Sequence, residues 1–222
     1  MKKYSVKDIP KELKFNIDTY NKVFGSLASN IEIEVFDPKE DIISFNKPID
    51  KLRFMIHGRA KITIIHEDGK QSIVHFVNSG EYLGELTFLE IEKEHKNVTA
   101  ISKSVFISVN MSLAKEKLIN DSEFLFGLSQ FIGEKMLGRT YFNSKNQNYK
   151  LKNRLAGYIL MSQNNGIYSE KHTETAEYLR VSYRHLLYTF KELIDDGVVV
   201  KVKKGYRVDI EKLGELSKDI KL

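Results

Sequence analysis

The hydrophobic residues between positions 31 and 110 fall into short runs that turn signals separate. Within 60–77, two apolar runs flank Glu67-Asp68-Gly69-Lys70, which is the pattern of a β-hairpin. Many short strands at this spacing predict an antiparallel sandwich or barrel with an enclosed core. Strands are expected in 31–36, in 50–58, twice in 60–77 and twice in 96–110, with a short helical stretch in 78–90.

Beyond residue 110 the apolar residues recur every three or four positions, which is the period of a helix. Ser112 is a suitable N-cap for a short helix, and Asp121 for a long helix that we expect to end near residue 145. The long helix either packs on the β domain or pairs two subunits, and we favour the subunit interface. The interface residues that this predicts are Leu125, Leu128, Ile132 and Met136.

From residue 151 the pattern predicts three helices followed by a two-stranded ribbon, which is the order of a winged helix-turn-helix. The helices are expected at 151–163, at about 173–179 and at 183–194, and the ribbon at 197–210 around Lys203-Lys204-Gly205. The expected domains are therefore a β domain over 1–120, a dimerisation helix over 121–146 and a winged helix over 147–222.

The helix at 183–194 has a polar and an apolar face when its residues are placed about 100° apart. Ser182 is a suitable N-cap, and Tyr183 lies in the first turn. Arg184, His185 and Tyr188 project from the polar face. A helix held to a scaffold by its other face fits the major groove of DNA, where side chains at its start reach base edges. The apolar face is predicted to hold Leu186, Leu187, Phe190, Leu193 and Ile194.

The distribution of charge supports a polyanion partner for the C-terminal part. The formal net charge is +5, and residues 147–222 carry 14 Lys and Arg against 10 Asp and Glu, a net of +4. The absence of cysteine excludes disulfides, thiolate zinc sites and cysteine-ligated iron–sulfur clusters. No apolar run is long enough to cross a bilayer and the N-terminus lacks a signal-peptide core, so we expect a soluble, cytoplasmic protein.

The segments FMIHGRAKI, HEDGKQ and NSGEYLGELTFLE, followed by TAEYLRVSYRHLLYTFKELIDDGVVV, together resemble the Crp/Fnr superfamily of bacterial transcription regulators. VSYRHLLY and KKGY are most similar to its YeiL-type branch. The resemblance covers about 31–210 and implies an α+β fold: an N-terminal β-roll (jelly roll) of the cyclic-nucleotide-binding type, a long dimerisation helix and a C-terminal winged helix-turn-helix.

The resemblance also implies functional residues. The base-contacting positions of the family fall on Tyr183, Arg184 and Tyr188, where the usual members have a Glu and an Arg at the last two, so a different operator is expected. Arg180 stands where the family often has Gly, which predicts some strain in that turn. The residues expected at the DNA backbone are His172, Thr173, Ser182, His185, Lys201, Lys203, Lys204 and Arg207.

The effector of the β-roll is expected not to be a cyclic nucleotide. Gly84-Glu85-Leu86 matches the family segment, but the Arg-Ser pair that follows it in cyclic-nucleotide sensors is missing, since no Arg occurs between Arg59 and Arg139. Lys96 or His95 could substitute only as point charges. The effector pocket is predicted to involve Gly84, Glu85, Leu86, Lys96 and Thr99, with no cofactor and no metal.

Two other classes of function remain open from the residues alone. His57, His66 and His75 permit a cupin-like metalloprotein or enzyme, although the close His-x-His pair is missing. A ligand-binding module that meets only protein partners would have no DNA affinity. We expect instead a non-enzymatic, homodimeric regulator whose partners are promoter DNA, a second copy of the chain and RNA polymerase, with no membrane.

Overall fold

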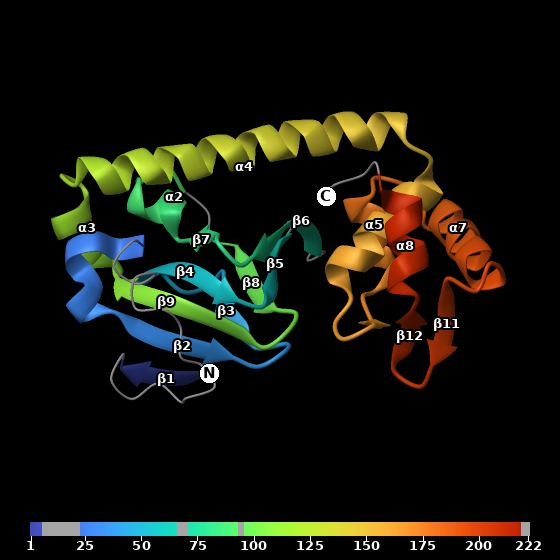
Figure 1. Ribbon diagram of the computed structural model, residues 1–222, viewed down its shortest axis with the longest axis horizontal. Coiled ribbons are helices and arrows are strands. Elements are labelled where there is room, and N and C mark those ends of the chain that lie inside the picture. Colours follow the sequence, from blue (N-terminus) through green and yellow to red (C-terminus); the bar gives the residue numbers. More distant parts are fainter. Residues whose placement is uncertain (6–22, 66–70, 93–95, 219–222) are drawn as a thin grey trace. The chain divides into compact units, whose positions relative to one another are not determined.

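The computed structural model describes residues 1–5, 23–65, 71–92 and 96–218, and its internal contacts group the chain into two units. One unit contains Met1–Ile64 and His75–Gly133, and the other contains Ile65–Val74 and Glu134–Leu222. The boundary between the two units in the second half of the chain falls within a single helix, α4 (Ser122–Asn148) (Figure 1).

The N-terminal strands form two antiparallel sheets around an apolar core. β9 is buried over nearly its whole length because β2 and β4 pair with both of its edges. The predicted strands are confirmed, while the turn at 67–70 lies outside the described residues. The five-stranded sheet is, in spatial order, β1 (Lys2–Ser5), β2 (Glu32–Phe36), β9 (Ser104–Asn110), β4 (Lys51–His57) and β7 (Tyr82–Leu83). The four-stranded sheet is β3 (Asp41–Ile43), β8 (Asn97–Ala100), β5 (Arg59–Ile65) and β6 (Gln71–Asn78).

Short helices close the β-roll: the 3-10 helix η3 (Gly25–Asn30), α2 (Glu85–Phe88) and α3 (Met111–Leu118). Gly84 precedes α2 with φ +87°, and a Cβ there would lie 2.7 Å from the Lys51 carbonyl oxygen, so glycine is needed. The predicted cap of α3 was wrong. Asn110, not Ser112, caps it, because the Asn110 Oδ1 accepts hydrogen bonds from the Ser112 and Leu113 amides.

The first turns of α4 pack on the β-roll, above α2 and β7 (Figure 1). Asp121 precedes α4 and accepts a hydrogen bond from the Phe124 amide at 3.0 Å, as a capping residue does. Phe124 and Phe131 make edge-to-face contacts with the Tyr82 ring, with ring centroids 6.2 and 5.3 Å apart. Leu128 is buried in the same core.

The C-terminal unit is a three-helix arrangement with a small sheet and a further helix (Figure 1). The three predicted helices and the ribbon are confirmed, whereas β10 and α8 were not predicted. The helices are α5 (Leu151–Ser162), α6 (His172–Tyr178), α7 (Tyr183–Asp195) and α8 (Ile210–Ser217). The sheet has the spatial order β10 (Ile167–Tyr168), β12 (Gly205–Val208) and β11 (Val199–Val202).

An aromatic cluster joins the sheet to the helices of this unit. Phe190 of α7 lies with its ring centroid 4.7 Å from Tyr206 of β12 and 5.7 Å from Tyr168 of β10. The Tyr168 hydroxyl is 2.6 Å from the Thr175 Oγ1 of α6. These buried contacts fix α6, α7 and the ribbon in one rigid scaffold.

Candidate nucleic-acid interface and effector region

The turn between α6 and α7 is held by hydrogen bonds to its backbone. The Val181 amide donates to the Ala176 carbonyl at 3.0 Å, and the Arg154 guanidinium of α5 donates to the Leu179 carbonyl at 2.9 Å. Arg180 has φ +53°, a left-handed conformation that costs a non-glycine residue about 1–2 kcal/mol. The expected strain at this position is thus confirmed.

The N-terminus of α7 is capped as predicted, because the Ser182 hydroxyl accepts a hydrogen bond from the His185 amide at 3.2 Å. The buried face differs from the predicted stripe. Leu187 and Ile194 are each 39% exposed, since they lie at the margin of the stripe, and Thr189 is buried in their place. The buried residues of α7 are Leu186, Thr189, Phe190 and Leu193.

The opposite face of α7 carries the side chains expected to contact bases. Tyr183 is 50% exposed and Tyr188 67% exposed, and Arg184 and His185 between them are exposed as well. Lys191, which the sequence analysis did not select, is also exposed one turn beyond Leu187. The start of α7 therefore presents hydrogen-bond donors and aromatic rings on a fixed backbone.

The β11–β12 ribbon presents cations beside this helix in the same unit. Lys201 pairs with Tyr206 and Val200 with Arg207, so the two cations lie on opposite faces of the ribbon. Gly205 has φ +117°, and a Cβ there would collide with the Tyr168 carbonyl oxygen. This close approach ties the ribbon turn to β10. The exposed cations of the ribbon are Lys201, Lys203, Lys204 and Arg207.

His172 is not placed as a charged phosphate contact. Its ring is half-buried, with its centroid 4.4 Å from that of Phe190, and it stacks on Tyr206 at 5.8 Å. Burial lowers the pKa of His172 below its ordinary value of 6.5, which disfavours the charged form of the ring. Thr173, in contrast, is exposed in the first turn of α6.

Polar side chains of the segment predicted to hold an effector form hydrogen bonds with one another. The Lys96 ammonium donates to the Glu92 carboxylate at 3.0 Å, and the Thr87 hydroxyl donates to the same carboxylate at 3.2 Å. Thr99 lies apart from this group, because on β8 it alternates with the buried Val98 and Ala100 and donates instead to Asp41 at 2.9 Å. Gly84, Glu85 and Leu86 do come together, at the start of α2.

A buried ionic cluster lies on one face of the five-stranded sheet. Glu34 is 1% exposed and accepts hydrogen bonds from the Lys51 Nζ at 2.9 Å and the Arg53 Nε at 2.8 Å. Lys51 also pairs with the half-exposed Glu32. Burial works against ionisation of Glu34, but the Arg53 and Lys51 charges and their hydrogen bonds hold the pKa of Glu34 below 4.5.

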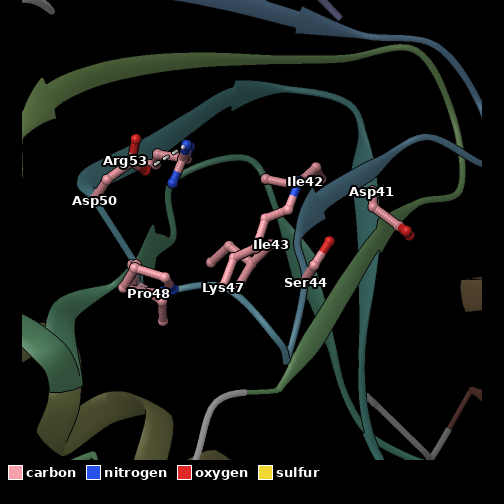
Figure 2. A pocket seen from close by; sticks show the side chains of 9 residues that line it. Asp41, Ile42, Ile43, Ser44, Lys47, Pro48, Asp50 and Arg53 are labelled. Atoms are coloured by element: carbon pink, nitrogen blue, oxygen red, sulfur yellow. Dashed lines mark ion pairs between the residues drawn. The ribbon is translucent and has the colours of Figure 1, made fainter.

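Arg53 of this cluster also lines a pocket of about 370 Å³ formed by β3, β4 and the connection between them (Figure 2). Asp50 pairs with the Arg53 Nη2 at 3.5 Å. The pocket has as many acidic as basic side chains, so its charge is balanced without a ligand. The residues that line it are Asp41, Ile42, Ile43, Ser44, Lys47, Pro48, Ile49, Asp50 and Arg53.

Comparisons with known proteins agree with this geometry. A crystal structure of a CRP/FNR-family transcriptional regulator from Thermus thermophilus has the same fold, with a TM-score of 0.63 at 17% identity over 84% of this chain and 98% of that one. The cyclic nucleotide-binding domain model matches residues 33–120. The regulatory protein YeiL of Escherichia coli O157:H7 is 36% identical over 157 residues, which are 71% of this chain and 72% of YeiL. This chain belongs to the CRP/FNR family of transcriptional regulators.

The structure of the c-di-GMP-responsive global regulator CLP from Xanthomonas campestris extends the same likeness. Its TM-score is 0.63 at 13% identity, and the match covers 87% of this chain and 99% of CLP. The likeness spans both units, so the β-roll and the winged helix of this CRP/FNR-family chain are each supported by solved relatives.

The histidines that suggested a metal site do not form one within the described residues. His57 is exposed at the end of β4, and the His75 Nε2 lies 2.8 Å from the Glu81 carboxylate, while His66 lies outside the described residues. No three His, Asp or Glu side chains of the described part gather as metal ligands. Likewise, no helix in the described ranges is both long and apolar enough to span a membrane.

Proposed function

We propose that this CRP/FNR-family regulator binds DNA sequence-specifically, with α7 in the major groove. The observation that carries the proposal is the division of α7 into a buried face, fixed by the aromatic cluster, and an exposed N-terminal face with Tyr183, Arg184 and Tyr188. Arg184 can donate two parallel hydrogen bonds to the O6 and N7 of a guanine, which discriminates by about 1–3 kcal/mol. The two tyrosines contribute hydrogen bonds and ring contacts to flanking bases.

Phosphate contacts would come from the elements on either side of α7. The exposed ribbon cations supply charge, and the Ser182 hydroxyl, which accepts from the His185 amide, still has its own proton to donate. His172 suits this group less well, because its half-buried ring packs on Phe190 and Tyr206 and its charged form is disfavoured. The proposed backbone contacts are Thr173, Ser182, His185, Lys201, Lys203, Lys204 and Arg207.

The test is fluorescence anisotropy with the DNA upstream of the chain's own gene, beside a scrambled duplex of equal length, over a series of salt concentrations. Tighter binding to the native fragment, with an affinity that falls steeply with salt, supports the proposal. A pool of duplexes with randomised sequence is then selected for binding to the protein, which also yields the operator if the upstream DNA lacks it. If this selection enriches no sequence that binds more tightly than the scrambled duplex, the proposal is wrong.

We also propose that α4 pairs two copies of the chain, through a different face from the predicted one. Leu128 is 2% exposed and so is covered by its own chain, and Leu125 and Ile132 are partly buried against the same β-roll core. Other large apolar side chains of α4 are exposed, and a Cβ at Gly133 would meet nothing within 4 Å. These apolar side chains are Phe126, Met136, Leu137 and Tyr141, of which only Met136 belonged to the predicted set.

A dimer suits a regulator because paired recognition helices meet two half-sites one helical turn apart. The double variant Phe126→Glu/Leu137→Glu should be monomeric by light scattering coupled to size exclusion. Arg139→Glu, exposed on the other side of the same helix, is the control and should remain dimeric. A double variant that keeps the dimer mass would place the interface elsewhere.

The remaining predictions stay proposals. Residues 1–120, 121–146 and 147–222 would act as sensor, dimerisation helix and DNA-binding domain, with RNA polymerase as the partner at the promoter. An effector, if bound near α2, would not be a cyclic nucleotide, because Lys96, one of the two residues that could replace the missing arginine, is already paired with Glu92.

A further inference from the structure

In the first two turns of α7, one aliphatic side chain is exposed at the edge of the polar face. Leu187 is 39% exposed although the remaining leucines of this helix are buried. On the helix surface its neighbours at three and four positions are the exposed Tyr183, Arg184 and Lys191 and, on its inner side, the buried Phe190. Leu187 therefore lies at the margin of the surface that is proposed to enter the major groove, beside Tyr183 and Arg184.

The major groove offers one apolar group to such a side chain. Guanine, adenine and cytosine present acceptors and donors there, with only a C5 hydrogen added in cytosine, whereas thymine alone carries a C5 methyl group. A leucine pressed against a polar base edge would leave that edge without a partner, while a leucine against a methyl group buries two apolar surfaces. The chemistry of Leu187 thus selects thymine among the four bases.

We propose that Leu187 contacts the 5-methyl group of a thymine and so specifies an A·T pair in each half-site. This inference rests on the proposed DNA-binding function. Cβ atoms three residues apart on a helix are about 5–6 Å apart, and successive bases on a strand are about 3.4 Å apart along the helix axis. The thymine therefore lies within about two base pairs of the guanine that Arg184 contacts.

The chain offers a matched control on the same helix. Ile194 is also 39% exposed, but it lies two turns further along, near the end of α7. It shares the chemistry and the exposure of Leu187 without its position among the base-contacting side chains. Because both are partly exposed, Leu187→Ala and Ile194→Ala should both leave the fold intact, which circular dichroism can verify.

The experiment replaces each thymine of the selected operator, one symmetric pair at a time, by deoxyuridine, which lacks only the methyl group. At one position the wild-type protein should lose affinity about four-fold per half-site, as expected for about one buried methyl. Leu187→Ala should bind the thymine and deoxyuridine duplexes equally, and Ile194→Ala should keep the wild-type ratio.

Two outcomes overturn the inference while DNA binding stands: no thymine is sensitive in the wild-type protein, or the sensitive thymine remains so in Leu187→Ala. If the wild-type protein binds no duplex specifically, both this inference and the proposed function fail. The anisotropy series with unmodified DNA, measured first, distinguishes the two cases.

Discussion

The polar groups of the two units are arranged in opposite ways. On α7 and the ribbon, tyrosines, arginine and lysines extend from a buried scaffold into solvent. In the β-roll, the charged side chains of the ionic cluster and of the Lys96 segment bind one another. The comparison indicates that the C-terminal unit is built to meet a partner, whereas these β-roll charges mainly stabilise the chain itself.

The two arrangements differ energetically. An exposed side chain on a rigid helix keeps its hydration until it binds, so removing it changes binding more than stability. A buried ion pair has already lost its hydration, so removing one partner leaves a buried charge uncompensated. Substitutions in the two units should therefore separate stability from binding.

The largest expected effect is in the ionic cluster. Glu34→Ala should lower the free energy of unfolding by about 3–5 kcal/mol, because it leaves Lys51 and Arg53 buried without their shared carboxylate. Urea denaturation followed by circular dichroism measures this loss. Glu32→Ala is the control, and since Glu32 is half-exposed it should cost less than about 1 kcal/mol. Equal losses of unfolding free energy in the two variants would show that burial does not determine how much each carboxylate stabilises the fold.

The same cluster predicts a pH dependence. The pKa of Glu34 is lowered in the folded state, so its stabilising contribution is complete above the ordinary value of 4.5 and is lost as the pH falls through the lower folded value. Stability of the wild-type protein should therefore fall more steeply below pH 4.5 than that of Glu34→Gln. Parallel curves for the two proteins would contradict this assignment.

A smaller effect is expected in the turn before α7. Arg180→Gly should raise the free energy of unfolding by about 0.5–1 kcal/mol, because glycine adopts φ +53° without the steric cost but loses more backbone entropy on folding. Asn165→Gly, at φ +49°, is a matched comparison and should gain less, since asparagine tolerates this conformation. Thermal unfolding of both variants gives the difference, and a gain only at Asn165 would refute the strain argument.

No effect at all is expected from a cyclic nucleotide. Cyclic AMP should give no heat in isothermal titration, because Glu92 occupies the Lys96 ammonium and no arginine is available in this segment. Glu92→Gln, which frees that cation, should bind at most weakly. Wild-type binding in the micromolar range would show that the β-roll is open to a phosphate after all.

The sequence predicted the helices and strands of the C-terminal unit better than it predicted how α4 packs on the β-roll. Periodicity and the Ser182 cap located α7, because a two-faced helix repeats its pattern over many residues. The periodicity wrongly predicted that Leu187 and Ile194 are buried, because side chains at the edge of the stripe are covered or exposed according to their neighbours. β10 has only two residues, which are too few to show a period. α8 begins where the predicted ribbon ends, and no helix was predicted there.

The long helix shows a different limit of sequence analysis. α4 has apolar residues on two sides, and periodicity alone does not tell which side meets the β-roll of the same chain. Leu128 was predicted to contact a partner subunit, but it is buried in its own chain. Phe124, on the same side of α4, packs against the Tyr82 and Phe88 rings of the β-roll. The exposed side, with Phe126 and Leu137, is known only from the fold.

The central claim is that α7 contacts bases while the ribbon contacts phosphates, and one paired measurement tests it most directly. Binding of Arg184→Ala and Lys203→Ala to the operator and to a scrambled duplex is compared over a salt series. Arg184→Ala should lose about 1–3 kcal/mol on the operator only, and Lys203→Ala should weaken both duplexes alike with a shallower salt dependence. If Arg184→Ala keeps the preference for the operator, α7 does not determine the sequence in this way.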